Sequence, residues 1–480
     1  MKRVTVYVLT VLAILSVGSC NKEDITGKKL RILCENYRPY NYVEGDSLKG
    51  LSVEIVGNIM GLMELKEMNV EIWDWEPALE LLRTEENIAL FTTGLTSNRK
   101  DDFQWVGPIA MFIDGFVGLK SGGFNITSVN EAKDLPSVGV ITDYSSTETL
   151  EKKNFENLVY FTTLSEAIDG LYDGTVSTVY DITYSILATA AADGHDVSQL
   201  TEIFNYSTTM AYIAFSADVS PKLVDAWQDK LDQLKRQGIV QQIYDEYLPG
   251  VTAPGLLTLF TEENPPVNYR TDDGSLTGSS VEIVEAMMDV IEQENPIIMT
   301  TWNDGYEQAL LVPNSMIFST IRNANRESLF HWVGPVCKKN YCFFVMDSST
   351  IELNTLDDAK ALGSVGVPEG WAAEQELEEL GFTNIQAWST PEKVFGKLLA
   401  GKVDAVVLND IAIDYLAQQA GISSDDVRNE LVLSSGENYL AFSIDTKEEY
   451  IQDWQQAYTT IMNNGTFAEI WEKWFPDIDW

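Results

Sequence analysis

The sequence is poor in basic residues. It has 32 Lys and Arg against 73 Asp and Glu, which gives a formal net charge of −41. A chain this acidic repels phosphate backbones and anionic lipid headgroups, so nucleic-acid binding is the function that the composition disfavours most, and we expect no nucleic-acid partner. A solvated acidic surface is the simplest interpretation, and a salt-rich habitat would select the same composition.

Histidine and cysteine are also scarce. The chain has two histidines, His195 and His331, and four cysteines. This is too few for a zinc site, and there is no HExxH motif, no nucleophile elbow and no phosphate-binding glycine loop. General acid–base work would need paired titratable groups, which the histidines do not offer. We therefore predict no metal, no cofactor and no enzymatic activity.

Two of the cysteines, Cys337 and Cys342, are close in sequence. In an exported chain such a pair can oxidise, because extracytoplasmic compartments allow disulfides. Two interpretations stay open here, a disulfide across a hairpin and two free thiols.

Long hydrophobic runs are absent. The apolar segment Val4 to Val17 follows Lys2 and Arg3 and is too short to span a bilayer. It ends in Val17-Gly18-Ser19-Cys20, which resembles a prokaryotic lipobox, so we predict a lipoprotein signal peptide over residues 1–19, lipidation of Cys20 and a polar tether over 20–27. A plain secretory signal with an incidental cysteine is the alternative. Either way the protein is expected outside the cytoplasm, in a periplasm or on a cell surface.

The chain repeats itself. The hexamer FQWVGP at Phe103 recurs as FHWVGP at Phe330, 227 positions later. The same offset relates further identical residues: Asn41-Tyr42 and Asn268-Tyr269, Arg99 and Arg326, Gly139 and Gly366, Gly174 and Gly401, Tyr212 and Tyr439, and Pro249 and Pro476. A chain of 480 residues exceeds one hydrophobic core. We predict two domains, residues 28–250 and 251–480.

Strand and helix signals alternate in each repeat. Leu30 to Cys34 and Leu256 to Phe260 are predicted to be strands. Helices follow from Gly50 and Gly278, with apolar residues at helical spacing and with Ser52 or Ser280 as a plausible N-cap. A second buried strand, SVGV, recurs at Ser137 and Ser364 and opens a second lobe. The rhythm predicts an α/β fold with mostly parallel sheets.

Several segments carry a resemblance to a known family. They include Pro39-Tyr40, Arg99 to Pro108, Arg326 to Pro335, GKVDAVV from Gly401 and GTFAEIWEKWF from Gly465. Both repeats resemble the polar amino-acid-binding branch, family 3, of the extracytoplasmic solute-binding proteins of ABC importers. The resemblance implies two tandem type II periplasmic-binding-protein domains, or Venus flytraps, each of two α/β lobes joined by a two-strand hinge. The WVGP segment would lead out of lobe one towards that hinge.

The resemblance also implies ligand-binding residues in the first domain. Arginine suits a carboxylate best because its planar fork donates two hydrogen bonds, and Arg99 stands where the family binds the ligand carboxylate. Trp75 falls where the family stacks an aromatic ring, and Asp181 where it places an ammonium acceptor. The full predicted set is Tyr37, Trp75, Thr92, Gly94, Thr96, Arg99, Tyr144, Ser145 and Asp181.

The second domain departs from this pattern. Its predicted set is Trp302, Ser319, Arg326, Trp371 and Asp410. Asn264 replaces Tyr37, and Ala372 replaces Ser145 with loss of the hydroxyl. The offset of Asp410 from Asp181 is 229 rather than 227. These changes predict a different or weakened specificity, and duplication without duplicated binding is an open interpretation.

The resulting prediction is a lipid-anchored binding protein. Each flytrap would close on an amino-acid-like solute and deliver it to an ABC permease. The alternative is a ligand-sensing module that signals through a membrane receptor partner, since tandem flytraps also form the outer parts of receptor kinases.

Overall fold

The computed structural model describes residues 3–6, 30–65, 68–126, 129–142, 144–271, 274–476, 478 and 480. The chain divides into two compact units, Met1–Leu256 and Leu257–Trp480, called here the first and second domains. This division lies a few residues beyond the predicted boundary. Cys20 and the tether lie outside the described residues, and of the predicted signal peptide the structure describes only strand β1 (Arg3–Val6), which pairs with β5.

Each domain alternates strands and helices. The first contains β2 (Arg31–Cys34), β3 (Tyr42–Glu44), β4 (Ser47–Lys49), α1 (Leu51–Leu62), β5 (Met68–Ile72), α2 (Trp75–Thr84), β6 (Ile88–Gly94), β7 (Gln104–Leu119), α3 (Val129–Ala132), β8 (Val138–Ile141), α4 (Ser145–Lys152), β9 (Leu158–Phe161), α5 (Leu164–Asp173), β10 (Thr178–Ile182), α6 (Thr183–Ala192), β11 (Leu200–Phe215), α7 (Pro221–Arg236) and α8 (Ile239–Tyr247). The second contains β12 (Thr258–Glu262), β13 (Tyr269–Arg270), β14 (Leu276–Thr277), α9 (Ser279–Val290), β15 (Ile297–Thr300), α10 (Trp302–Leu311), β16 (Ser315–Ile321), β17 (Phe330–Met346), α11 (Leu356–Lys360), β18 (Val365–Pro368), α12 (Ala372–Glu379), β19 (Ile385–Trp388), α13 (Pro391–Leu399), β20 (Ala405–Asn409), α14 (Ile413–Ala420), β21 (Val427–Ser443), α15 (Glu448–Asn464) and α16 (Thr466–Trp474). Short 3₁₀ turns are η1 (Lys120–Gly122), η2 (Val197–Gln199), η3 (Asp410–Ala412) and η4 (Ser424–Asp426).

The two main sheets have the same topology. The strand order is β1-β5-β2-β6-β11-β7-β10-β8-β9 in the first domain and β15-β12-β16-β21-β17-β20-β18-β19 in the second. Apart from β1, each strand of the first sheet has a counterpart at the same place in the second. The predicted fold class is therefore confirmed: the chain holds two tandem type II binding-protein domains, each with two α/β lobes.

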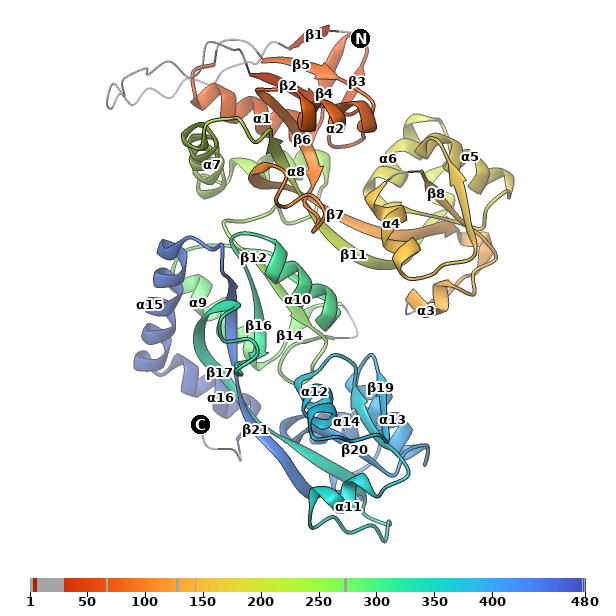
Figure 1. Ribbon diagram of the computed structural model, residues 1–480, viewed down its shortest axis with the longest axis vertical. Helices are drawn as coiled ribbons and strands as arrows, with labels where there is room; N and C mark the ends of the chain where they lie inside the picture. The colour runs from red at the N-terminus through yellow and green to blue at the C-terminus, as the bar shows by residue number, and fades with distance from the viewer. Residues whose placement is uncertain are drawn as a thin grey trace. The chain divides into compact units, whose positions relative to one another are not determined.

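Two long antiparallel strands join the lobes of each domain (Figure 1). In the first domain β7 and β11 pair from Gln104 with Phe215 to Leu119 with Leu200. At one end β11 also pairs with β6 of lobe one, and at the other β7 also pairs with β10 of lobe two. Strands of 16 residues span roughly 50 Å, enough to cross both lobes. The WVGP segment begins β7, as predicted.

The C-terminal helices of each repeat pack against lobe one and complete its hydrophobic core. In the first domain Trp227 of α7 is fully buried and packs edge-on against Phe215, with ring centroids 5.4 Å apart. In the second domain Trp454 of α15 packs in the same manner on Phe442, at 5.8 Å. The aromatic pair thus buries a large apolar surface at matched positions of both cores.

Helices α1 and α9 begin at glycines rather than at the predicted serine caps. Gly50 and Gly278 are the N-cap residues, with φ of 129° and 128°. A Cβ atom at Gly50 would lie 2.3 Å from the carbonyl oxygen of Tyr40, so only glycine fits. Ser52 lies inside the helix and its hydroxyl is buried. The backbone of Tyr40 lies so close to Gly50 that no capping side chain fits at this position.

Cys337 and Cys342 are free thiols, which overturns the disulfide interpretation. Both are buried and lie on the same strand, β17. Five residues along one strand separate the two Cα atoms by roughly 17 Å. A disulfide needs Cα atoms within about 7 Å, so an extended strand cannot close this bond.

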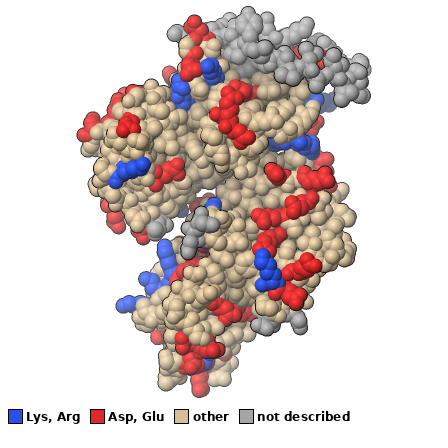
Figure 2. All heavy atoms as spheres, turned by 180° about the vertical axis from the view of Figure 1, so that it is seen from behind, with Lys and Arg blue, Asp and Glu red and all other residues tan. Residues whose placement is uncertain are grey.

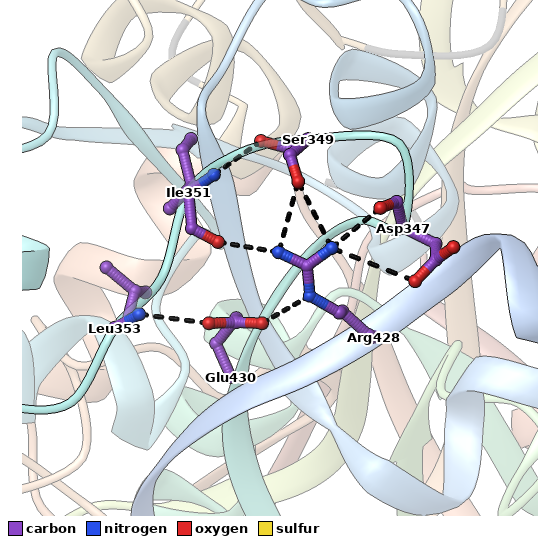
Figure 3. Close-up of polar contacts among 6 residues, drawn as sticks. All are labelled: Asp347, Ser349, Ile351, Leu353, Arg428 and Glu430. Carbon is purple, nitrogen blue, oxygen red and sulfur yellow. Dashed lines mark hydrogen bonds and ion pairs between the residues drawn. The ribbon is translucent and has the colours of Figure 1, made fainter.

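A partly exposed guanidinium fixes the loop after β17 in lobe two of the second domain (Figure 3). Arg428, at the start of β21, donates to the carbonyl oxygens of Asp347, Ser349 and Ile351. It also pairs with the carboxylate of Glu430, which accepts a 2.9 Å hydrogen bond from the amide of Leu353. The network ties the end of one hinge strand to the start of the other.

The face of the molecule in Figure 2 carries many more acidic than basic side chains, consistent with the overall charge. Over the part of the chain that the structure describes, no helix combines the length and the apolar character that crossing a membrane requires.

Candidate functional site

Two adjoining cavities lie between the lobes of the first domain. The inner one, of about 50 Å³, is lined by eight of the nine predicted residues, all except Thr96. The outer one, of about 280 Å³, is lined by Thr96 together with Arg99 and Tyr144. The structure therefore brings the predicted first-domain residues to one place, although they come from segments more than 100 positions apart.

Arg99 supplies the positive charge of this site. Its side chain is 7% exposed, and its guanidinium carbon lies 5.1 Å from the ring centroid of Trp75, the first residue of α2. Burial lowers its pKa from the ordinary value, but the group stays a cation at any physiological pH. Within the described residues no carboxylate forms an ion pair with it. The arrangement can bind an anion that reaches the cavity.

Thr92 lies beside this arginine on β6 and has an unusual backbone. Its φ is +64°, and Ser319 has φ +61° at the matched position in the second domain. A β-branched residue in the left-handed region is strained. Both hydroxyl oxygens are buried and have no partner among the described residues. A strained residue that aims an unsatisfied donor at a cleft is typical of a ligand site.

Three carboxyl groups line the same inner cavity. Glu35 follows β2, Asp114 lies on the hinge strand β7, and Asp181 lies on β10. Asp181 accepts hydrogen bonds from Tyr37 and Ser146, both 2.9 Å long. Glu35 accepts a 2.8 Å hydrogen bond from the Tyr144 hydroxyl.

Two of these hydrogen bonds cross the cleft. Tyr37 and Glu35 belong to lobe one, and Asp181 and Tyr144 belong to lobe two. Tyr37 and Tyr144 also contact each other edge-on, with centroids 6.0 Å apart. The lobes therefore meet through two tyrosine–carboxyl contacts.

Burial raises the pKa of all three carboxyl groups. The pKa is about 7 for Glu35, about 7 for Asp114 and about 6 for Asp181. The negative charge of Asp181 raises the pKa of the other two further, while hydrogen bonds from Tyr144 and Ser207 partly counteract burial. Because like charges at close range oppose ionisation, the cluster is a site that a cation would stabilise.

The second domain has a cleft of related shape. A cavity of about 340 Å³ is lined by Trp302, Arg326 and Gly370, among others. Arg326 is 4% exposed, and its guanidinium lies 4.9 Å from the ring centroid of Trp302 and 5.2 Å from that of Tyr306. Ser319 lies on β16 before it. The arginine and tryptophan thus repeat the geometry of the first domain.

Trp371 joins the lobes of this domain. It is the N-cap residue of α12, as Tyr144 is of α4. Its indole nitrogen donates a 2.9 Å hydrogen bond to Glu262, which is the counterpart of Glu35 at the offset of 227. In both domains an aromatic residue of lobe two therefore donates to the glutamate at the end of the first strand of lobe one.

Asp410 does not lie in this cleft, which corrects its predicted role. Its carboxylate accepts hydrogen bonds from the amide and the side chain of Asn340, and it lines a separate cavity beside Tyr269. Asn409, one position earlier, points instead towards Asn264, at 3.4 Å. One residue along an extended chain turns the side chain to the opposite face, so the offset of 229 selected the wrong neighbour.

Sequence reasoning missed four buried ionisable residues: Glu35 and Asp114, which line the first cleft, and Glu262 and Lys339, which interact in the second domain. One signal was available. Glu35 and Glu262 are identical at the offset of 227, and each lies two positions before the matched pair Tyr37 and Asn264. Asp114 and Lys339 differ between the repeats, so the internal comparison could not mark them.

The second domain matches a known family. Residues 257–477 match the model of the bacterial extracellular solute-binding proteins, family 3. The second domain belongs to this family. The first domain repeats its strand order and its cleft geometry, so the chain is a tandem of two such solute-binding folds. No match was found among curated proteins.

Solved structures of similar fold include single and tandem binding domains. The arginine-, lysine-, histidine-binding protein ArtJ from Geobacillus stearothermophilus is 18% identical, with a TM-score of 0.41, over 46% of this chain and 96% of its own. The periplasmic domain of BvgS from B. pertussis is 16% identical, with a TM-score of 0.39, over 95% of each chain. A histidine kinase sensor domain is 15% identical, with a TM-score of 0.43, over 46% of this chain and 96% of its own.

The carboxyl cluster predicts how the stability of the first domain depends on pH. Its groups have folded-state pKa values of about 6 to 7, above the value near 4 of an unfolded carboxyl. The stabilisation they contribute is present below pH 4 and is lost as the pH rises through 7, because charges must then be buried. We expect the free energy of unfolding of the first domain to fall by on the order of a few kcal/mol between pH 5 and pH 8. Its melting temperature should fall with it.

Asp114→Asn is the matched variant for this measurement. It removes one titrating group but keeps the shape of the side chain, so calorimetric scans of the variant should show a smaller fall in the transition assigned to the first domain. An equal fall in both proteins would contradict the assignment of the pH dependence to this cluster.

Proposed function

We propose that the first domain binds an amine-bearing, amino-acid-like solute between its lobes, and that the chain acts as an extracytoplasmic solute-binding protein. One observation carries the proposal. A buried guanidinium, Arg99, lines the same cavity as three carboxyl groups, Glu35, Asp114 and Asp181. A cationic group beside several carboxyl groups complements a ligand that carries both a carboxylate and an ammonium group.

Each part of such a solute has a partner here. A ligand carboxylate facing Arg99 would accept two hydrogen bonds from the guanidinium N–H groups. It would accept a third from the hydroxyl of Thr92. An ammonium group would lie among the carboxyl groups and relieve their mutual repulsion. The rings of Tyr37, Trp75 and Tyr144 would enclose the apolar part.

Binding requires the cleft to open. The inner cavity of about 50 Å³ is far smaller than the roughly 300–1,000 Å³ of typical small-molecule pockets. A solute must therefore separate Tyr37 from Asp181 or displace Tyr144 into the outer cavity. A ligand that touches both lobes stabilises the closed form by its differential affinity, so binding is coupled to lobe closure.

Replacing Arg99 tests the carboxylate site. We expect Arg99→Ala to weaken binding of an amino acid by about 2 to 5 kcal/mol, the usual loss when one partner of a buried charge pair is removed. Arg99→Lys should recover only part of the affinity, since a lysine lacks the planar fork. Titration calorimetry against a panel of amino acids and small dicarboxylates measures both.

Arg83→Ala is the control. Arg83 also lines the outer cavity, but its side chain is 44% exposed and its contact with Asp102 is long, at 3.9 Å. Unchanged affinity in the Arg99 variant, or an equal loss in both variants, would contradict the site.

The use made of closure depends on the partner. Delivery to an ABC permease is one function, and signalling through a membrane receptor is the second candidate. The second is favoured by the difference between the two clefts, since Tyr37 and Asp114 become Asn264 and Tyr341 at matched positions. Two non-identical clefts suit the detection of two inputs better than the delivery of one solute.

Amino-acid uptake by the cells that produce the protein distinguishes delivery to a permease from signalling. If the chain delivers its solute, cells that carry Arg99→Ala should lose most uptake of the radiolabelled amino acid identified by calorimetry. If the chain is a sensor, uptake should stay normal while the transcriptional response to that amino acid is lost. A chain carrying Arg83→Ala should behave as the native protein in both assays.

Membrane attachment is part of the proposal and is tested separately. A lipidated Cys20 would hold the domains at the outer face of a cell membrane, through the tether of residues 20–27. We expect Cys20→Ser to move the protein from the membrane fraction to the soluble extracytoplasmic fraction. A variant that stays in the membrane fraction would rule out this anchor.

A further inference from the structure

The buried charges of the two clefts have opposite balance. In the first domain, Glu35 has anionic neighbours, since Asp181 and Asp74 both raise its pKa. In the second domain Glu262 has cationic neighbours, since Lys339 and Arg326 both act to lower the pKa that burial raises to about 7. The matched glutamates thus differ in their charged neighbours: those of Glu35 are anionic, while Glu262 has two cations and the weaker influence of Glu263.

Lys339 is the source of this difference. It lies on the hinge strand β17 at the position of Phe112, which lines the inner cavity of the first domain. The pairing of the hinge strands confirms the match, because Phe112 pairs with Thr209 and Lys339 with Gly436, again 227 positions on. The side chain is only 5% exposed.

The lysine ammonium is held by aromatic rings. Its nitrogen lies 5.2 Å from the ring centroid of Tyr341 and 5.5 Å from that of Trp371. Tyr341 stands where the first domain has Asp114, and Trp371 where it has Tyr144. Aromatic faces attract a cation strongly once it is desolvated. Burial acts to lower the pKa of Lys339, but the surrounding Tyr341, Cys337 and Glu262 raise it overall, so the group is charged at neutral pH.

The chain's own ammonium group therefore stands in the place that a ligand ammonium takes in the proposed first-domain complex. The carboxyl groups that would receive a second ammonium are gone, since Asp114 is replaced by Tyr341 and the contact of Asp181 with Tyr37 is replaced by that of Asn409 with Asn264. Glu262 remains, but Trp371 and the field of Lys339 already satisfy it.

Arg326 keeps its function in this cleft. It is buried against Trp302 and Tyr306, lines the cavity of about 340 Å³ and has no carboxylate at ion-pair distance among the described residues. The guanidinium of Arg326 therefore lacks an anionic partner among the described residues. With Lys339 nearby, two buried cations face one buried carboxyl group.

We propose that the second domain selects small carboxylates that lack an ammonium group, such as 2-oxo acids, and excludes amino acids because Lys339 occupies the ammonium position. The inference rests on the proposed function, in that each domain binds its solute in the cleft beside its buried arginine. The ligand carboxylate would pair with Arg326, and an uncharged or anionic group would face Lys339.

Matched pairs of ligands test this. The chain carrying Arg99→Ala, in which the first cleft is weakened, is titrated with 2-oxoglutarate and glutamate, and with pyruvate and alanine. We expect the oxo acid of each pair to bind at least tenfold more tightly, and Arg326→Ala to abolish this binding. Adding Lys339→Met should weaken oxo-acid binding and shift the preference towards the amino acid by tenfold or more.

Two variants control for structural effects. Lys338→Met changes the adjacent lysine on the opposite face of β17, whose side chain is 43% exposed, and should leave the preference unchanged. Lys339→Arg keeps a cation in place and should keep the preference, which covers the case that Lys339→Met fails to fold, as judged by circular dichroism and thermal unfolding.

Three results would overturn the inference: amino acids that bind the second domain as tightly as their oxo acids, a preference that Lys339→Met leaves unchanged, and no binding of any of the four ligands at millimolar concentration. Amino-acid binding by the native chain that Arg99→Ala removes would show that the proposed function of the first domain holds in each of these cases.

Discussion

The pairing of the two hinge strands is the constraint on which the rest of each domain depends. Strands β7 and β11, and β17 and β21, hydrogen-bond along nearly their whole length and are the shared centre of a sheet that continues into both lobes. Because side chains alternate along a strand, this register decides which positions face the cleft. Asp114 and Lys339 reach the clefts from these strands, so the element that allows the lobes to move also supplies the charges that the ligand would meet.

Much of this architecture could be predicted from the sequence, because a repeat in register is a strong physical signal. Phe103 and Phe330, or Trp227 and Trp454, recur only if the same backbone recurs around them, and the identical strand orders confirm this. The arginine and tryptophan of each cleft were found for the same reason. Eight of the nine residues predicted for the first cleft line one cavity, although that comparison could not say how closely the lobes approach each other.

The errors arose where the two repeats differ or where one residue decides the direction of a side chain. The resemblance predicts an aspartate and so points to Asp410, but Asn409 contacts Asn264 of lobe one and Asp410 accepts from Asn340. Cys337 and Cys342 were compatible with a disulfide only while their strand was unknown. Lys339 gave no signal at all, since a lone lysine in a strand is usually solvated and only the packing of Trp371 and Tyr341 around it shows that it is buried.

In the proposed functions, the two clefts share one scaffold and differ in the ligand chemistry that they accept. The scaffold of hinge, strained cleft residue, buried arginine and tryptophan is retained in both domains. In the proposed complexes these parts would position the ligand carboxylate in either cleft. Three differences in the remaining wall change its charge and polarity: Phe112 becomes Lys339, Asp114 becomes Tyr341 and Tyr37 becomes Asn264. Together they are self-consistent, because Lys339 gains Tyr341 and Trp371 as the neighbours of its ammonium and Glu262 gains a counter-charge. The cleft residues can therefore differ between the domains while the hinge that presents them stays the same.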